Sequence, residues 1–372
     1  MTELSDFNPN RLILARQRRG LTKKLLADLS GLSSKLVTLY ENGTQEPTSE
    51  SLERLSNALR FSMAFFMGHD VDAPTDTNAS FRSFSRMTSG QRDGALAAGG
   101  IAYLLADWID VRFNVPKPEV PDCSGMDPEA AAMVVRAEWL LGDRPIKNLI
   151  HLLESKGIRV FSLAEETKQV NAFSCWRRGT TPFVFLNTQK SSEASRFDAA
   201  HELGHLVLHR HGENKGKEVE AEANAFASAL LMPRDSILAY ASGCKSTAGI
   251  LRAKKYWNVS AMALTYRLHK VGILTEWVYR DLCIAFSNMG ARTNEIDPSP
   301  RETSQVLQKV LNHSRDKGTS LQSIASDLNV NAEDLAANLF GLAPVMVSRP
   351  GAPPQIRAGG RPPELKLVSG SK

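Results

Sequence analysis

Residues 196–233 read RFDAAHELGHLVLHRHGENKGKEVEAEANAFASALLMP. The letters HELGH at 201–205 form the pattern H-E-x-x-H. On a helix, two histidines four positions apart lie on one face, so both imidazoles can reach one metal ion. Glu202 points about one residue further around the helix, where its carboxylate can contact a water molecule on that ion. The pattern therefore predicts His201 and His205 as zinc ligands and Glu202 as the general base of a hydrolytic site.

The residues around the motif predict two adjacent helices. Apolar residues recur at helical spacing through the motif, after a helix start at 191–193. A second helix begins at Val219 and carries an apolar stripe up to Pro233. Alternate alanines along it would let the two helices pack closely. A catalytic zinc requires three protein ligands and an open fourth position, and Glu220 is the first candidate for the third ligand, with Glu222 the second.

His211 is a further candidate for the third ligand. It occupies the last position of the longer pattern H-E-x-x-H-x-x-G-x-x-H that metzincins carry. Position 208 is leucine, however, where that pattern requires the glycine of a sharp turn, so Glu220 is preferred. His209 is expected near the site at the helix end rather than as a ligand. The alternative is that the motif belongs to a buried helix whose histidines are incidental and bind no metal.

The run HELGHLVLH, followed by EAEANAFASALLMP, resembles the ImmA/IrrE family of metallo-endopeptidases. In that family the two motif histidines and a downstream glutamate bind zinc. The resemblance thus implies His201, His205 and Glu220 as zinc ligands and Glu202 as the base. It also implies a substrate class, a repressor- or antitoxin-like protein, because family members relieve repression by cutting a repressor.

Length and composition limit the class of protein. A chain of 372 residues with 42% hydrophobic content is long enough for two or three domains. A net charge of +5 is weak evidence for nucleic-acid binding by itself. Four scattered cysteines do not suit a disulfide scaffold or a zinc ribbon. The polar start of the chain and the lack of an apolar run near 20 residues predict a cytoplasmic protein with no membrane segment.

Residues 8–68 predict a bundle of five helices. Thr22 caps the second helix, and the third runs from Ser33 or Ser34 to a turn at 42–43. Two short helices joined by a glycine-containing turn describe a helix-turn-helix unit, whose third helix would enter the major groove of DNA by its N-terminal end. The residues expected to contact DNA are Lys23, Ser34, Lys35 and Thr38.

Six cations precede or begin the second of these helices with no acid between them: Arg11, Arg16, Arg18, Arg19, Lys23 and Lys24. They predict a surface that faces phosphates. The run from Leu21 to Gly68 resembles the lambda-repressor/Cro-like helix-turn-helix of the XRE group. Lys23 departs from the glutamine that many members carry, which favours a phosphate contact there. The resemblance implies double-stranded operator DNA as partner, and a homodimer is the usual arrangement.

The fold class predicted from these patterns is mainly α (α+β). The expected limits are 1–70 for the helix-turn-helix domain, 71–122 for a linker and connecting helix, 123–297 for a zincin-like peptidase domain, 298–347 for a C-terminal helical subdomain and 348–372 for a disordered tail. The connecting helix, from Thr88 to Phe113, is expected to pack in the core or to serve dimerisation. An aromatic and basic segment at 81–87 has no assigned chemistry.

Three short strands are predicted before the zinc helix, at 158–163, 172–176 and 182–187, as a small three-stranded sheet. Pro182 favours either the start of a strand or an edge position for the last strand, because proline cannot donate to a strand ladder. An exposed edge could hold an extended peptide by added-strand hydrogen bonds. A peptide substrate would suit such an edge.

Two functions follow from these predictions. The first is a DNA-binding regulator with an active zinc endopeptidase domain. The second is a DNA-binding regulator whose zinc domain is a sensor or oligomerisation module with little peptidase activity. The presence of Glu202 favours the first, because a purely structural zinc site has no need of a general base.

Overall fold

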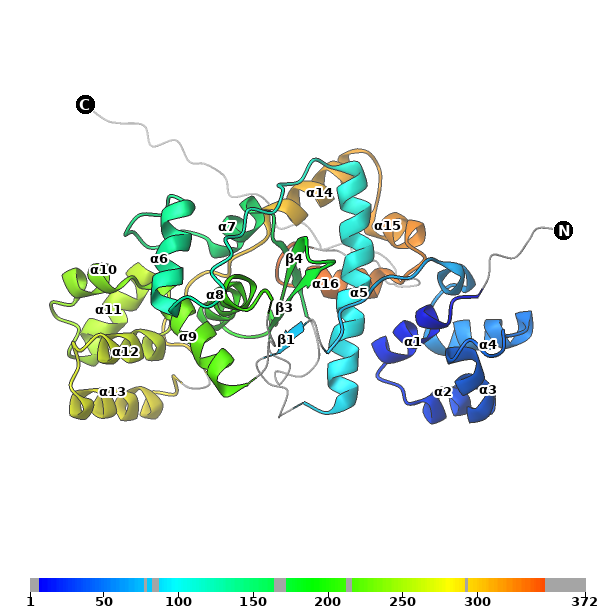
Figure 1. The fold of residues 1–372 in the computed structure, drawn as a ribbon, viewed down its shortest axis with the longest axis horizontal. Helices are drawn as coiled ribbons and strands as arrows, with labels where there is room; N and C mark the ends of the chain where they lie inside the picture. Colours follow the sequence, from blue (N-terminus) through cyan, green and yellow to red (C-terminus); the bar gives the residue numbers. More distant parts are fainter. Residues whose placement is uncertain are drawn as a thin grey trace, which may run out of the picture.

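The computed structural model describes residues 7–76, 79–81, 87–163, 172–211, 216–291 and 294–344. Over these ranges the chain is mainly helical with one small sheet (Figure 1), which confirms the predicted fold class. The tail 348–372, which we expected to be disordered, lies outside the described residues. Residues 82–86 of the aromatic and basic segment lie outside them as well.

The N-terminal unit contains four α-helices and one 3-10 helix, which confirms the predicted five-helix bundle. The elements are α1 (Pro9–Arg18), α2 (Lys23–Ser30), α3 (Ser34–Glu41), α4 (Ser49–Leu59) and η1 (Met63–Met67). Side chains cap the helices as their types predict: Thr22 accepts from the amide of Leu25 at 3.1 Å, and Ser33 accepts from the amide of Leu36 at 3.2 Å.

Helix α5 (Ser89–Arg112) joins this unit to the rest of the chain (Figure 1). Among the described helices, it alone is long and apolar enough for a membrane span, contrary to the expectation that no such run exists. However, 78% of its apolar window is buried inside the protein, as in the core helix of a globular fold. Gly100 brings α1 close, since a Cβ there would lie 2.8 Å from a methyl carbon of Leu14. The connecting helix therefore packs in the core.

The described sheet has four strands in the order β1-β3-β4-β2. They are β1 (Ala79–Phe81), β2 (Arg159–Ser162), β3 (Phe173–Arg177) and β4 (Thr181–Leu186). The three predicted strands are all present, and β1 is added from the segment expected to be a linker. It pairs antiparallel with β3, which also pairs antiparallel with β4, whereas β2 runs parallel to β4.

Of the two positions predicted for Pro182, the edge strand is wrong, because β4 lies inside the sheet between β3 and β2, whereas Pro182 does lie at the start of its strand. Proline is tolerated there because the pairing of β4 with β2 begins one residue later, at Phe183 opposite Arg159. The missing N–H of Pro182 thus falls before that ladder starts. The outer strands of the described sheet are β1 and β2.

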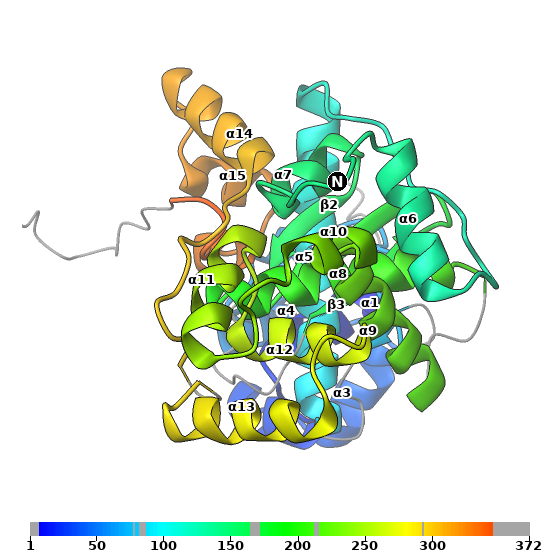
Figure 2. The ribbon, with the colours of Figure 1, turned by 90° about the vertical axis from the view of Figure 1, so that its left-hand side faces the viewer.

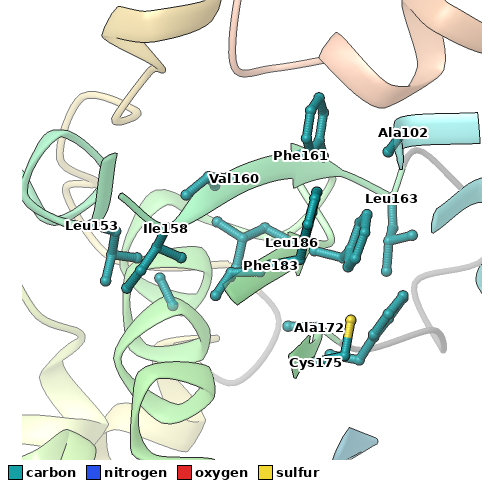
Figure 3. Close-up of a cluster of buried hydrophobic side chains, with 14 of the residues drawn as sticks. Ala102, Leu153, Ile158, Val160, Phe161, Leu163, Ala172, Cys175, Phe183 and Leu186 are labelled. Atoms are coloured by element: carbon teal, nitrogen blue, oxygen red, sulfur yellow. The ribbon is translucent and has the colours of Figure 1, made fainter. Parts of the chain in front are cut away.

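Aromatic side chains fill one face of the sheet, under α5. The rings of Phe173 and Phe185 stack with centroids 4.4 Å apart, and Tyr103 of α5 packs on Phe183 at 4.4 Å. Figure 3 shows part of this cluster, with Phe161 of β2 beside the side chains of β4. Because side chains alternate along a strand, the opposite face carries Ser174, which contacts the motif helix.

The predicted motif helix, α8 (Ser192–Leu208), packs on that opposite face of the sheet and against α9 (Lys217–Leu231). Gly204 permits the close approach of α8 and α9, since a Cβ there would lie 3.2 Å from the Cα of Ala223. The remaining helices of this region are α6 (Pro128–Glu138), α7 (Leu149–Ser155), α10 (Arg234–Tyr240), α11 (Thr247–Trp257), α12 (Ala261–Lys270) and α13 (Glu276–Asn288).

Three helices follow at the C-terminal end: α14 (Gln305–Asp316), α15 (Leu321–Asp327) and α16 (Ala332–Leu339). Figure 2 shows α14 and α15 at the opposite end of the molecule from α13. Helix α16 packs on α5 and β2. It also reaches the N-terminal unit, where Asp334 forms ion pairs with Arg18 at 3.1 Å and Arg19 at 2.8 Å.

Candidate metal centre and nucleic-acid interface

The candidate metal centre lies where α8 meets α9. His201 Nε2 lies 3.4 Å from one carboxylate oxygen of Glu220, and His205 Nε2 lies 3.5 Å from the other. The two Nε2 atoms are 3.1 Å apart. One ligand atom from each of the three side chains lies within 4.8 Å of the others. The three residues predicted as ligands are thus brought together, with both histidines buried and Glu220 partly exposed.

The chemistry of these donors fits a zinc ion. The lone pairs of two ring nitrogens that face each other at 3.1 Å repel one another, unless a proton or a cation lies between the two atoms. A nitrogen, nitrogen, oxygen donor set of this kind suits zinc. Burial raises the pKa of the Glu220 carboxyl, but the facing imidazoles of His201 and His205 lower it by more, so its pKa lies well below the usual value. Glu220 is therefore ionised, as a metal ligand must be.

A chain of polar contacts leads outward from His205. Its Nδ1 lies 3.1 Å from Nδ1 of His209, and Nε2 of His209 lies 2.8 Å from a carboxylate oxygen of Glu222. Burial lowers the pKa of His209, and the Glu222 carboxylate opposes that shift. Glu222, the second candidate for the third ligand, is thus engaged with His209. It can orient His205 through that ring in the way that outer partners orient metal-bound histidines.

His211, the other alternative ligand, is absent from the cluster. Its Nε2 lies 2.8 Å from a carboxylate oxygen of Asp122, and its side chain is 67% exposed. Leucine occupies the position where the longer pattern has the glycine of the turn that carries the third histidine to the metal. His211 therefore lies at the surface of the protein, away from the candidate metal centre.

The predicted base, Glu202, points toward the sheet. Its Oε2 accepts hydrogen bonds from the hydroxyls of Ser80 at 2.9 Å and Ser174 at 2.8 Å. Complete burial raises the pKa of Glu202 to about 7, although the nearby charge of His205 and the two serine hydroxyls act to lower it. A carboxyl with a pKa near neutrality suits proton transfer at physiological pH.

Neither serine was identified from the sequence. Ser174 could have been found, because it is a polar residue between two apolar ones in a strand next to the motif helix, and its hydroxyl therefore points at that helix. Ser80 carried no such signal, since it lies in a segment that reads as a linker. Its contact with Glu202 spans 122 positions of the chain.

A cavity of about 1310 Å³ lies beside α8, α9 and α12. Asp198, one turn before His201, and Asn224, one turn after Glu220, both line it. Tyr266 also lines this cavity and is 46% exposed. The turns of α8 and α9 next to those that carry the candidate ligands thus border a space large enough for side chains of another molecule.

The four residues predicted to contact DNA lie on α2 and α3 at the outer side of the N-terminal unit (Figure 1). Ser34 and Lys35 are exposed at the start of α3. Thr38 is half-buried and donates to the carbonyl of Ser34 at 2.9 Å. Lys23 is 40% exposed and lies 3.2 Å from Glu41. The beginning of α3 is therefore open to a partner. Lys23, in contrast, pairs with Glu41, which also pairs with Arg16.

The prediction that six cations form a phosphate-facing surface is wrong for its four arginines, because each of them binds an acceptor within the fold. Arg11 is buried and donates to the carbonyl of His69 at 2.8 Å. Arg16 pairs with Glu41, and Arg18 and Arg19 both pair with Asp334. The planar guanidinium group binds carboxylates and carbonyls in two-point contacts, so these side chains join elements of the fold. The acids come from distant parts of the chain, which a local count of charges does not register.

Comparison with known protein families finds a match in each of the two regions that contain these residues. A helix-turn-helix family model matches residues 12–66, which contain α2 and α3. A peptidase-family model described as the IrrE N-terminal-like domain matches residues 153–269, which contain the sheet strands β2 to β4, the H-E-x-x-H motif and Glu220. No curated protein matches the chain at a significant level. The chain is therefore a fusion of an XRE-type helix-turn-helix DNA-binding domain with an IrrE-like domain of the ImmA/IrrE metallopeptidase family.

Proposed function

We propose that this protein is a DNA-binding transcriptional regulator whose second domain is a zinc-dependent endopeptidase that cleaves a repressor- or antitoxin-like protein. The observation that carries the proposal is the convergence of His201, His205 and Glu220, with Glu202 adjacent. A zinc ion held by those three side chains would supply a Lewis acid for a peptide carbonyl and lower the pKa of water.

The remaining residues of the site support a proton-transfer role for Glu202. Its carboxyl, with a pKa of about 7, can accept a proton from water at neutral pH and pass it to the leaving amine. The hydroxyls of Ser80 and Ser174 fix the direction of that carboxylate. His209 holds the ring of His205 in place, so the ligand does not have to reorient during the reaction.

For the DNA-binding domain, we propose that α3 enters the major groove of an operator, with Ser34 and Lys35 at the groove and Lys23 and Thr38 at its border. The exposure of the first turn of α3 supports this proposal. We propose a cytoplasmic homodimer as the form that binds the two half-sites of an operator.

We keep the domain limits expected from the sequence, with one refinement. The limits are 1–70, 71–122, 123–297, 298–347 and 348–372. The segment 71–122 supplies β1 to the sheet and α5 to the core, so we propose that it folds together with the peptidase domain.

The proposal is tested by zinc content per chain and by peptidase activity. We expect wild type and Glu202→Gln each to hold about one zinc ion per chain, because the three ligands are intact in both. Glu220→Ala should lose the ion. Only wild type should hydrolyse a protein substrate. If no form binds zinc, the peptidase proposal is refuted.

The second candidate is a regulator in which the IrrE-like domain is a sensor or oligomerisation module. The direct ion pairs of Asp334 with Arg18 and Arg19 favour it, because they connect the C-terminal helices to the DNA-binding domain. Zinc binding without hydrolysis by wild type would select this function.

A further inference from the structure

Strand β1 lies on the edge of the sheet that is closest to Glu202. Without β1, the described sheet would have β2 and β3 as its outer strands. Of these two, β3 carries Ser174, whose hydroxyl donates to Glu202 at 2.8 Å. The outer edge of β3 is therefore the edge that passes the candidate base.

The pairing of β1 with β3 places one small side chain, that of Ser80, beside the candidate general base Glu202. Ser80 lies directly opposite Ser174, and their hydroxyl oxygens are 2.8 Å apart. The hydroxyl of Ser80 also lies 2.9 Å from the Glu202 carboxylate. Ser80 is 1% exposed and Ala79 is fully buried, so the position has no room for a larger side chain. Glu202 thus makes direct contact with β1, a strand from the segment 71–122 between the two domains.

A peptide that binds to a sheet as an additional strand requires a free edge, since its backbone must pair with the unsatisfied N–H and C=O groups there. An endopeptidase must also bring a backbone segment of its substrate within reach of the general base. The position that satisfies both conditions is the outer edge of β3 beside Glu202. Strand β1 occupies that position.

We propose that the outer edge of β3 is a binding site for an extended peptide and that β1 is its internal occupant. This inference rests on the proposed peptidase function, whose substrate it describes: a segment in β conformation with a small residue, such as serine or alanine, opposite Ser174. Because β1 is part of the same chain, its effective concentration at the site is on the order of millimolar, so a separate peptide competes at a disadvantage.

The short length of β1 makes exchange feasible. Only three residues, Ala79 to Phe81, pair with β3, and a strand of that length adds little stability by itself. The pairs that β3 makes with β4 do not depend on β1. Removal of β1 would therefore leave the β2–β4–β3 part of the sheet in place.

The test measures binding of a fluorescent synthetic peptide with the sequence of residues 75–87 to the full-length protein, by anisotropy at about pH 8. Ser80→Asp places a second carboxylate beside buried Glu202, which disfavours the internal pairing. We expect this variant to bind the peptide at least tenfold more tightly than wild type does. The matched control is Ser89→Asp, the same change at an exposed position of α5, and it should bind as wild type.

A second variant covers the case in which Ser80→Asp does not fold. Ala79 lies directly opposite the free thiol of Cys175, so Ala79→Cys can form a disulfide that locks β1 on β3. Oxidised Ala79→Cys should lose peptide binding at least tenfold, and a phosphine reductant should restore it to the wild-type value. Equal binding by the oxidised and reduced forms would overturn the proposal, as would wild-type affinity in a folded Ser80→Asp.

The peptide-binding readout is independent of zinc and of hydrolysis. If the protein holds no zinc and yet Ser80→Asp gains peptide binding, the strand site stands and the peptidase function falls. If zinc is bound and a protein substrate is cleaved while neither variant changes peptide binding, the strand site falls and the peptidase function stands.

Discussion

Glu220 and Glu222 lie two positions apart on α9, and they meet different partners. Glu220 faces the two motif histidines, whereas Glu222 contacts His209 at 2.8 Å. A difference of two residues on a helix is about 200° of rotation, so the two carboxylates cannot serve the same point. As a result, α9 supplies both a candidate ligand, Glu220, and an outer partner, Glu222. His209 lies between Glu222 and the candidate ligand His205.

This arrangement predicts a role for His209 in metal affinity. His209→Ala should lower zinc affinity by about 10–100-fold, because the ring that orients His205 is lost. His211→Ala is the matched control, since His211 is exposed and pairs with Asp122. Competition with a chromophoric chelator measures both affinities. An equal loss in the two variants would contradict the assigned roles.

At the scale of elements, a buried carboxylate holds together α7 and α14. Glu154, near the end of α7, accepts hydrogen bonds from the amides of Gln305 at 2.9 Å and Val306 at 3.2 Å. These amides belong to the first turn of α14, where N–H groups have no partner within the helix. The hydroxyl of Ser304 also donates to Glu154. Burial nevertheless raises the pKa of Glu154, so the folded protein favours its neutral form.

The sign of that shift predicts how stability depends on pH. A carboxyl whose pKa is raised on folding stabilises the fold fully below its unfolded pKa of about 4.3, and this contribution is lost as pH rises through the higher folded pKa. Glu154→Gln keeps an acceptor that does not ionise. The melting temperature of wild type minus that of the variant should therefore fall as the pH rises above about 4. A difference that does not change with pH would contradict the raised pKa of Glu154.

At the scale of the molecule, the DNA-binding unit is attached at two places. Leu14 of α1 contacts α5 at Gly100, and Arg18 and Arg19 share the carboxylate of Asp334 on α16. Asp334 is only 5% exposed, so its charge is largely removed from water. The N-terminal and C-terminal parts of the chain therefore contact each other, and both contact α5.

Asp334→Ala should loosen this attachment. Removal of one partner from a buried ion pair costs about 3–5 kcal/mol, because the remaining charges lose their compensation. We expect a larger radius of gyration in small-angle scattering, since the buried ion pairs between α1 and α16 are then lost. Glu333→Ala removes an exposed pair with Arg60 and should leave the radius unchanged. An unchanged radius in Asp334→Ala would place the attachment elsewhere.

The helical parts of this protein follow closely from local sequence. The caps Thr22, Ser33 and Thr88 lie at helix starts as their side chains predict. Periodicity places His201 and His205 on one face of a helix, and the close packing of two helices through small residues lets Glu220 reach both. These predictions succeed because helical geometry converts short distances along the chain into distances in space.

The contacts that span the chain did not follow from the sequence. Ser80 meets Glu202 across 122 positions, and Arg19 meets Asp334 across 315. The sequence by itself determined the two domains, the motif helix and the candidate ligands, because each depends on spacing within one or two helices. Only the tertiary structure decided which strand occupies the edge of β3 and which acids neutralise the arginines of α1. Those outcomes depend on how distant elements pack, and no local pattern of residues records that packing.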